Sequence, residues 1–184
     1  MKNDSVRMIR ENMENIPEYP VPDGFAIRNY RRNEGHIWTR IQQAAEPYIN
    51  IDTGLFDREF KRDLPAMEDR SFFLTTDTGE AIGTITAWWQ PNLNGKVWGQ
   101  VHWVAIHPDY QGQGLSKPMM SVAMTRLKQS HARCFLDTST GRLPAVKVYL
   151  DFGFTPDLSD SESRQAWAAV APVLEHPALE EFRR

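Results

Sequence analysis

The chain has 184 residues, which is enough for one domain with its own hydrophobic core. Its net charge of -3 gives no reason to expect nucleic acid or an anionic membrane as a partner. No apolar run approaches the ~20 residues of a membrane span, and the N-terminal residues lack the apolar core expected of a signal peptide. With a single cysteine, Cys134, which we expect to be a buried structural thiol, these features predict a cytoplasmic protein.

The N-terminal segment has helical spacing. Residues 5–16 place Val6, Ile9, Met13 and Ile16 on one helical face, and the prolines at 17, 20 and 22 end the helix. The simpler interpretation is a helix that packs on the body of the protein. The alternative is an arm that contacts a second subunit.

A strand and two helices are predicted next. Residues 25–31 alternate apolar and polar side chains and predict the first strand. Asn33 is expected to cap a helix that runs to about Glu46, and residues 48–65 predict a loop and a second short helix. This region is acidic, and we interpret its carboxylates as a solvated helix face: Glu46, Asp52, Asp57, Glu59 and Asp63.

Three strands with tight turns follow and predict an antiparallel meander. They cover residues 71–76, residues 81–89 and a segment that begins at Lys96. The meander is rich in tryptophan, and alternation allows only some of these side chains to face the core: Trp88, Trp89, Trp98 and Trp103. Packing is the default role, and the others are expected at a pocket or a dimer face.

Residues 101–128 combine a strand, a glycine loop and a helix. Proline lacks an N–H, so Pro118 belongs in a first helical turn and predicts a helix start near residues 114–116. The main-chain N–H groups of residues 113–117 then lack helical partners and form an anion site. Gly112 and Gly114 allow a bulky diphosphate to approach, and Lys117 adds a full charge.

The loop matches neither of two common phosphate-binding patterns. The P-loop lysine is missing, which weighs against a nucleotide-binding protein, and Gly112-x-Gly114 is followed by Lys117 where a dinucleotide fingerprint has glycine. Residues 111–116 (QGQGLS) fit Q/R-x-x-G-x-G/A except for Ser116. Preceded by VAIHPDY, this segment resembles the acetyl-CoA-binding segment of the GNAT superfamily of acyl-CoA-dependent N-acyltransferases.

A second motif supports the resemblance. Residues 133–138 predict a buried fifth strand, and Ser139 or Thr140 is expected to cap a helix with Pro144 in its first turn. That helix carries Ala145-x-x-x-Tyr149-x-x-x-Gly153-Phe154, which is similar to the GNAT helix beside the pantetheine arm of the cofactor. The resemblance implies that Tyr149 protonates the leaving thiolate; a core tyrosine is the alternative.

The resemblance implies an α/β (α+β) fold with a mixed, mostly antiparallel central sheet of six or seven strands flanked by helices. Its fourth and fifth strands splay apart to admit acyl-CoA. The predicted domains are an N-terminal helical extension (1–24), a GNAT-like acyltransferase domain (25–156) and a C-terminal helical tail packed on it (157–184). The tail has a candidate capping box at Ser159 and Glu162, and no seventh strand is evident.

The resemblance also assigns residues to acetyl-CoA, with no metal. Backbone groups near Val104 are expected to pair with the pantetheine, the amides of residues 113–116 to hold the diphosphate, and Gln111 and Lys117 to add side-chain contacts. Arg142 replaces a usual asparagine, and we expect it to reach the cofactor phosphates. The full predicted set is Val104, Ala105, Ile106, Gln111, Gly112, Gln113, Gly114, Leu115, Ser116, Lys117, Thr138, Arg142, Ala145 and Tyr149.

An acceptor amine is protonated at neutral pH, so transfer of an acyl group to it needs a base. His102 is our candidate, because imidazole titrates near neutral pH. It is expected two residues before Val104 on the same strand face, where family members often carry a base. A histidine held at the sheet surface is the alternative. Asp137 is a weaker second base, and His107 belongs to a structural turn. The acidic region at residues 46–63 corresponds to one wall of the family's acceptor site, where it would favour a cationic amine.

The predicted function is therefore transfer of an acetyl group from acetyl-CoA to a primary amine of a small molecule or peptide, by direct attack in a ternary complex. The alternative is a non-catalytic acyl-CoA-binding module. The tryptophans and the terminal extensions predict a homodimer. The sequence does not identify the acceptor.

Overall fold

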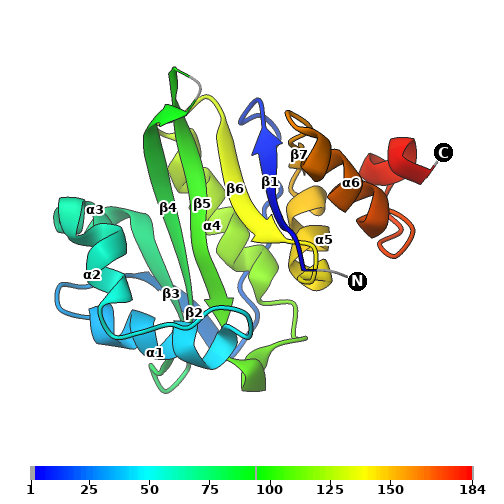
Figure 1. Cartoon of the computed structure of the whole chain (residues 1–184). Coiled ribbons are helices and arrows are strands. Elements are labelled where there is room, and N and C mark those ends of the chain that lie inside the picture. Colours follow the sequence, from blue (N-terminus) through cyan, green and yellow to red (C-terminus); the bar gives the residue numbers. More distant parts are fainter. Residues whose placement is uncertain (1–2, 94, 184) are drawn as a thin grey trace.

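A single seven-stranded sheet forms the centre of the protein in a computed structural model, which describes residues 3–93 and 95–183. The strands lie in the order β2-β3-β4-β5-β6-β1-β7, and all neighbours are antiparallel except β5 and β6 (Figure 1). Their bounds are β1 Ser5–Arg10, β2 Phe25–Asn29, β3 Ser71–Thr76, β4 Ala81–Leu93, β5 Lys96–Ile106, β6 Cys134–Ser139 and β7 Thr155–Pro156. The mixed, mostly antiparallel sheet predicted from the resemblance is confirmed.

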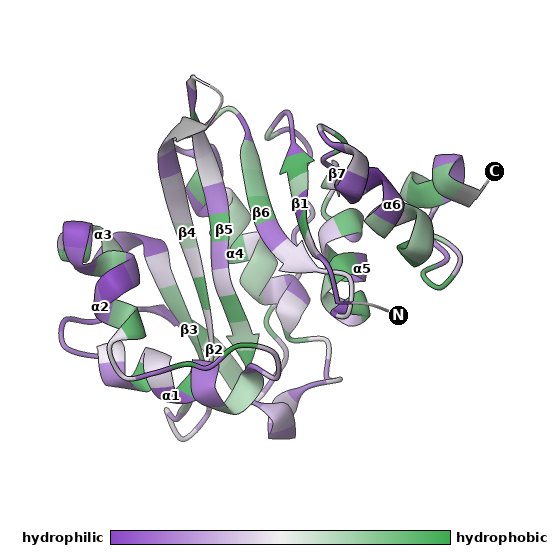
Figure 2. Cartoon of the chain, in the orientation of Figure 1, coloured by the Kyte–Doolittle hydropathy of each residue, from purple (hydrophilic) through white to green (hydrophobic). Residues whose placement is uncertain are grey.

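Helices cover both faces of this sheet. One face carries α1 to α3, and the other carries α4 and α5, with α6 beyond β1 and β7 (Figure 1). Hydrophilic residues concentrate on the outward turns of α2, α3 and α6 (Figure 2). The helix bounds are α1 Gly35–Ala45, α2 Leu55–Phe60, α3 Leu64–Arg70, α4 Ser116–Lys128, α5 Leu143–Asp151 and α6 Ser161–Val170.

The core is divided in two by the sheet, as strand alternation requires. On β3, Phe72 and Leu74 join the cluster beneath α4, whereas Phe73 joins the cluster beneath α1 to α3. The second cluster is largely aromatic: Trp38, Phe56 and Phe60 pack with ring centroids 5.2–5.6 Å apart. The aromatic cluster therefore anchors α1 and α2 to the sheet.

The prediction of a helix over residues 5–16 is wrong. Residues 5–10 form β1, which pairs with β6 from Ser5↔Ser139 to Arg10↔Cys134 and with β7 at Met8 and Ile9. Val6, Met8 and Arg10 are buried, which is the two-residue period of a strand. Apolar residues at 6, 9 and 13 fit a helix equally well, and only the position between β6 and β7 decides between the two.

The seventh strand that was not evident in the sequence is β7, Thr155–Pro156, and β1 separates it from β6 (Figure 1). Arg10 stabilises this edge of the sheet, because its guanidinium donates hydrogen bonds to the carbonyls of Asn12, Phe152 and Glu14. The N-terminal residues thus complete the sheet, and nothing in their placement requires a second subunit.

Most of the remaining elements agree with the predictions, and the differences lie at helix caps and in one helix, α3. α4 begins at Ser116, within the predicted range, and Gly153 ends α5 with φ +76°. Asn33 does not cap α1; it has φ +71°, and Glu34 precedes the helix without a side-chain cap. Neither Ser139 nor Thr140 caps α5, whose N-cap is Arg142, and Asp160 rather than Ser159 caps α6. Helix α3 was missed.

The C-terminal tail packs on the same core. Trp167 and Val170 of α6 and Leu179 of the 3₁₀ turn at Pro177–Arg183 are fully buried in the cluster that includes Met8. Trp88 and Trp98 are also buried, so packing explains part of the tryptophan excess.

Homodimerisation stays a prediction. Within the described residues, no helix combines the length and hydrophobicity needed to span a membrane.

The strand assignment for residues 5–10 predicts which side chain carries stability. Met8→Ala removes a fully buried side chain and is expected to lower the free energy of unfolding by about 2–5 kcal/mol. Ile9→Ala, on the half-buried opposite face, is expected to cost less. Urea denaturation of both variants measures this order. A larger loss of stability for Ile9→Ala would contradict the strand assignment and favour the predicted helix.

Candidate functional site

The site lies where β5 and β6 separate. They pair in parallel at Gly99↔Cys134 and Gln100↔Phe135, and the ladder ends there although β5 continues to Ile106 and β6 to Ser139. Beyond that point β6 pairs with β1 on its other edge. The splay predicted for the fourth and fifth strands is therefore present, and it exposes the backbone edge of β5 from Val101 onward.

A β-bulge lies in this exposed part of β5. Opposite β4, the register passes from Thr86↔His102 to Thr84↔Ala105, so β5 contains one extra residue. Trp103 occupies the left-handed region with φ +50°, which is rare for a bulky side chain. Its carbonyl accepts a hydrogen bond from Gln42 Nε2 of α1 at 3.0 Å. This fixes the strained residue against α1.

The bulge changes which way the neighbouring side chains point. Val101, Val104 and Ile106 pack in the cluster beneath α4, whereas Trp103 and Ala105 pack in the cluster beneath α1 to α3. His102 lies beside Phe60 of that second cluster, at 6.0 Å between ring centroids. The expectation that His102 and Val104 share one strand face is therefore wrong, because it assumed regular alternation.

The glycine loop leads directly into α4. Gly112 and Gly114 have φ +77° and +75°, and the side chain of Gln111 donates to the Ile106 carbonyl at 2.8 Å. Leu115 precedes the helix without a side-chain cap, so the first main-chain N–H groups point out of its N-terminus. A Cβ placed on either glycine would meet no atom within 4 Å. The loop therefore needs glycine for its backbone conformation, and the space above it is open.

A cavity of about 540 Å³ connects this loop to the splay. It is bounded by β5, the glycine loop, the start of α4, α5 and the end of α1. Most of the residues predicted to bind acetyl-CoA line it: Val104, Ala105, Ile106, Gln111, Gly112, Gly114, Leu115, Ser116, Arg142, Ala145 and Tyr149. We call it the donor cavity.

A second cavity of about 420 Å³ adjoins the donor cavity, and we call it the acceptor cavity, after the amine acceptor that the sequence predicts beside His102. It is lined by His102, Asp137 and Thr138 among others. Tyr149 and Val104 line both cavities. The structure thus brings the two predicted catalytic side chains, His102 and Tyr149, to one continuous site.

Tyr149 is placed by α5 at the junction of the two cavities. Its side chain is 8% exposed, and burial raises the pKa of Tyr149 to about 12, against a smaller lowering effect of the Arg142 charge. The hydroxyl therefore keeps its proton throughout the neutral range. A protonated hydroxyl at this position is suited to donate to a leaving group.

His102 is held by a carboxylate that the sequence did not single out. Glu59 Oε2, from α2, lies 2.9 Å from His102 Nε2 and 3.0 Å from Trp103 Nε1. The hydrogen bond from His102, followed by the one from Trp103, holds the pKa of Glu59 below its usual value despite partial burial. The acidic region thus supplies one carboxylate to the site.

Three of the other four carboxylates of that region have separate partners. Asp52 pairs with Arg58, Asp63 caps α3, and Glu46 is buried in a bidentate pair with Arg142, at 2.7 and 2.8 Å. Glu46 lies at the wall of both cavities, already neutralised by the arginine. The acidic region is neither a uniformly solvated face nor a uniformly negative wall.

Several predicted residues are engaged away from the expected contacts. Arg142 spans from α5 to Glu46 and stacks over Tyr48, so its guanidinium is not free to reach phosphates. Lys117 lies 3.3 Å from Asp151 and over the Tyr19 ring, which raises the pKa of Lys117, and it does not line the donor cavity. The Gln113 side chain is exposed outside it, so this residue can offer its backbone alone.

The two lesser histidine and aspartate candidates also have structural partners. Asp137 accepts two hydrogen bonds from Arg7, at 2.7 and 3.1 Å, and His107 caps the turn at Pro108–Tyr110 by accepting from the Asp109 amide. His107 thus has the structural position predicted for it.

Among the described residues, no group of three or more His, Cys, Asp or Glu side chains could hold a metal.

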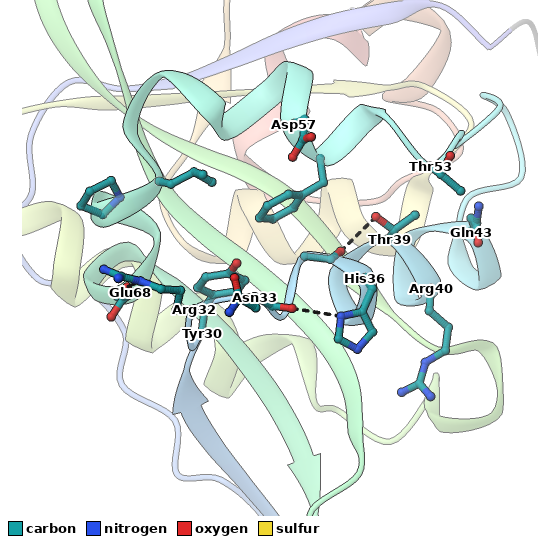
Figure 3. A pocket seen from close by; sticks show the side chains of 14 residues that line it. Tyr30, Arg32, Asn33, His36, Thr39, Arg40, Gln43, Thr53, Asp57 and Glu68 are labelled. Atoms are coloured by element: carbon teal, nitrogen blue, oxygen red, sulfur yellow. Dashed lines mark hydrogen bonds and ion pairs between the residues drawn. The ribbon is translucent and has the colours of Figure 1, made fainter.

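A third cavity, of about 750 Å³, lies between α1, α2 and α3, away from the splay. Figure 3 shows its polar lining, with Asp57, His36 and Arg40 around it. None of the residues predicted for catalysis or cofactor binding lines it. It is larger than the donor cavity but has no connection with the glycine loop.

Fold and site together define a class: α/β proteins whose central sheet opens beside a glycine loop and an uncapped helix N-terminus. A family model for the acetyltransferase (GNAT) family matches residues 21–154. The chain belongs to the GNAT acetyltransferase family, and the resemblance drawn from its two motifs is confirmed.

Curated relatives carry the name mycothiol acetyltransferase. One from Streptomyces bingchenggensis is 28% identical over 144 residues, covering 76% of this chain and 46% of the relative. Another, from Mycobacterium ulcerans, is 24% identical and covers 89% of this chain and 56% of the relative. The chain thus spans about half the length of the curated relatives it matches.

Solved structures support the fold. A GCN5-related N-acetyltransferase from Sphaerobacter thermophilus has a TM-score of 0.62 at 17% identity, covering 84% of this chain and 49% of the other. A GNAT-family acetyltransferase from Colwellia psychrerythraea has a TM-score of 0.65 at 10% identity, covering 84% and 53%. The NatC complex, bound to Gag peptide and CoA, has a TM-score of 0.55 at 18% identity, covering 69% and 82%.

The buried cysteine is expected not to react with thiol reagents in the native protein. Cys134 is fully buried, and burial raises the pKa of its thiol to about 12, so it stays protonated at pH 8. Ellman's reagent is expected to titrate no thiol in the native protein and the single cysteine after urea denaturation. Val97→Cys, at a position 54% exposed, is the reactive control. Rapid native labelling of Cys134 would contradict the described packing of β6.

Proposed function

We propose that the protein is an N-acetyltransferase that moves an acetyl group from acetyl-CoA to a primary amine by direct attack in a ternary complex. One observation carries the proposal: Tyr149 lies where a cavity that ends at a glycine loop meets a cavity that contains His102. A donor and an acceptor can therefore occupy the site together and meet beside an acid and a base.

The donor cavity fits the parts of acetyl-CoA. The diphosphate would lie at the N-terminus of α4, where main-chain N–H groups of residues 113–116 and the helix dipole favour an anion. The pantetheine would extend along β5, whose edge from Val101 to Ile106 has no β6 partner in the described ladder. Ala145 and Tyr149 of α5 would cover its other side. Gln111 acts by holding the loop, and Thr138 lies on the acceptor side.

The chemistry needs three proton transfers within the site. His102 takes a proton from the acceptor ammonium, and the neutral amine then attacks the thioester carbonyl carbon. As the C–S bond breaks, Tyr149 donates its proton to the departing sulfur and recovers one from the amide nitrogen. The net products are an N-acetyl amine, CoA and one proton, which His102 releases to solvent.

The acceptor class is limited by what the acceptor cavity offers. Glu46 and Asp137 are already neutralised by Arg142 and Arg7, and much of the rest is uncharged and polar, including Asn3, Ser5, Gln100 and Ser139. This favours a small polar amine or a peptide N-terminus. The relatives' name, mycothiol acetyltransferase, is compatible with a small-molecule acceptor, and the peptide in the NatC structure is compatible with a peptide acceptor.

Donor binding depends on the glycine loop. Gly114→Val forces a β-branched residue to φ +75° and is expected to weaken CoA binding at least about tenfold, measured by calorimetry. Gly79→Val is the matched control, because Gly79 has φ +84° and open surroundings in the β3–β4 turn. Equal affinity in wild type and Gly114→Val, or no heat with CoA at all, would contradict the proposed donor site.

Catalysis is tested by thiol release from acetyl-CoA with a panel of amines. Tyr149→Phe and His102→Ala are each expected to lower kcat by about 10²–10⁴ while CoA still binds. Tyr30→Phe, another buried tyrosine, is the control and should keep the wild-type rate. Tight CoA binding by the wild-type protein without turnover of any amine would instead favour the non-catalytic acyl-CoA-binding module.

A further inference from the structure

Glu59 makes an unusual pair of contacts. Its single oxygen Oε2 lies within hydrogen-bond distance of two consecutive residues of β5, His102 Nε2 at 2.9 Å and Trp103 Nε1 at 3.0 Å. In a regular strand, consecutive side chains point to opposite faces and cannot share one partner. The bulge at Trp103 removes this restriction. The backbone irregularity of β5 thus has a local consequence, which is to present both rings to α2.

The structure holds this strained arrangement from several sides. Trp103 is fixed by the hydrogen bond from Gln42 to its carbonyl and by the Trp38 ring, 5.4 Å away between centroids. Phe60, the next residue after Glu59, packs edge-on against Trp38 at 5.6 Å. A strained, non-glycine residue at a site is maintained only when its surroundings determine its position. The aromatic cluster therefore sets the position of Glu59 relative to His102.

The contact determines which imidazole nitrogen carries the proton. The lowered pKa of Glu59 keeps the carboxylate ionised at neutral pH, and an ionised carboxylate only accepts hydrogen bonds. His102 Nε2 must therefore donate. In the neutral ring this leaves the lone pair on Nδ1, which is the nitrogen able to take a proton.

We propose that Glu59 is a positioning residue for acetyl transfer: it fixes His102 as the Nε2–H tautomer, with Nδ1 as the basic atom, and Trp103 fixes Glu59. This inference rests on the proposed function, in which His102 deprotonates the acceptor. When Nδ1 takes the proton from the ammonium, the ring becomes positive while Nε2–H stays bonded to the Glu59 carboxylate. The charge formed on the base is thereby compensated, and the proton leaves to solvent after transfer.

Other charges around the site are already paired. Besides His102, the charged groups that line the acceptor cavity or act on Glu59 are Arg58 of α2, Glu46 at the end of α1, Arg142 at the start of α5 and Asp137 of β6. Arg58 pairs with Asp52, Glu46 with Arg142, and Asp137 with Arg7. Glu59 is the carboxylate that contacts the ring.

The decisive test compares Glu59→Gln with Asp57→Asn. Both replace a carboxylate of α2 by its amide, but Asp57 lies at the third cavity (Figure 3) and does not contact His102. Long-range ¹H–¹⁵N NMR on histidine-labelled protein reads the tautomer directly. We expect the Nε2–H form of His102 in the wild type and in Asp57→Asn, and a mixture in Glu59→Gln, whose amide can both donate and accept.

Kinetics provide the second readout. Glu59→Gln is expected to lower kcat at least about tenfold with little change in the KM for the amine, whereas Asp57→Asn is expected to keep both values. A merely structural role for Glu59 would leave unchanged the tautomer of His102 that NMR reads.

The two readouts separate failure of this inference from failure of the proposed function. An Nδ1–H tautomer in the wild type, or an unchanged tautomer and unchanged kcat in Glu59→Gln, would overturn the role of Glu59 while leaving acetyl transfer intact. Turnover of no amine by the wild type would overturn the proposed function and, with it, the catalytic meaning of Glu59. The NMR result would then still decide whether Glu59 sets the tautomer.

Discussion

The separation of β5 from β6 is the constraint on which the rest of the structure depends. Two parallel pairs hold the strands together at Gly99 and Gln100, and beyond them each strand must satisfy its backbone elsewhere. β6 does so through β1, and α5 follows it to form the far wall of the opening. β5 does so through β4 and through Gln42 and Gln111, which bond two of its carbonyls, so no strand pairs with its other edge beyond Gln100 in the described ladder. An interior opening with an unpaired strand edge is suited to a long ligand that contains amide groups.

Three backbone positions with positive φ convert this opening into a site. Gly112 and Gly114 turn the chain so that α4 begins with its N-terminus toward the donor cavity, and Trp103 turns two side chains toward α2. The left-handed backbone at Trp103 is unfavourable by itself. Packing of Trp38, Phe56 and Phe60 around it stabilises this conformation. The packing of α1 and α2 thus stabilises the fold and also sets the geometry around His102.

Much of this could be predicted from the sequence because some signals are local. The glycine loop and Pro118 located the start of α4, and Ala145, Tyr149 and Gly153 located α5 and its end. Proline restricts φ and glycine permits positive φ irrespective of tertiary contacts. Most of the residues predicted at the donor cavity follow from these two segments, and Val104, Ala105 and Ile106 follow from the strand before the loop.

The remaining features depend on tertiary contacts. Residues 5–10 carry apolar side chains at spacings that suit a helix or a strand, and their position between β6 and β7 decides the outcome. The residues VHWVAI contain no signal that predicts a β-bulge. The prediction assumed regular strand alternation and therefore placed His102 and Val104 on one face. Arg142 and Lys117 were expected at phosphates, but Glu46 and Asp151, distant in sequence or on another helix, neutralise them. Glu59 was one of five acidic residues, and only its contact with β5 distinguishes it.

The central claim is that a single ligand extends from the N-terminus of α4 along the free edge of β5. A crystal structure of the protein with CoA tests it most directly. The account predicts density for the diphosphate at the main-chain amides of residues 113–116 and for the pantetheine between β5 and α5, ending beside Tyr149. Density for CoA elsewhere on the surface, with the space between β5 and β6 filled by protein, would contradict it.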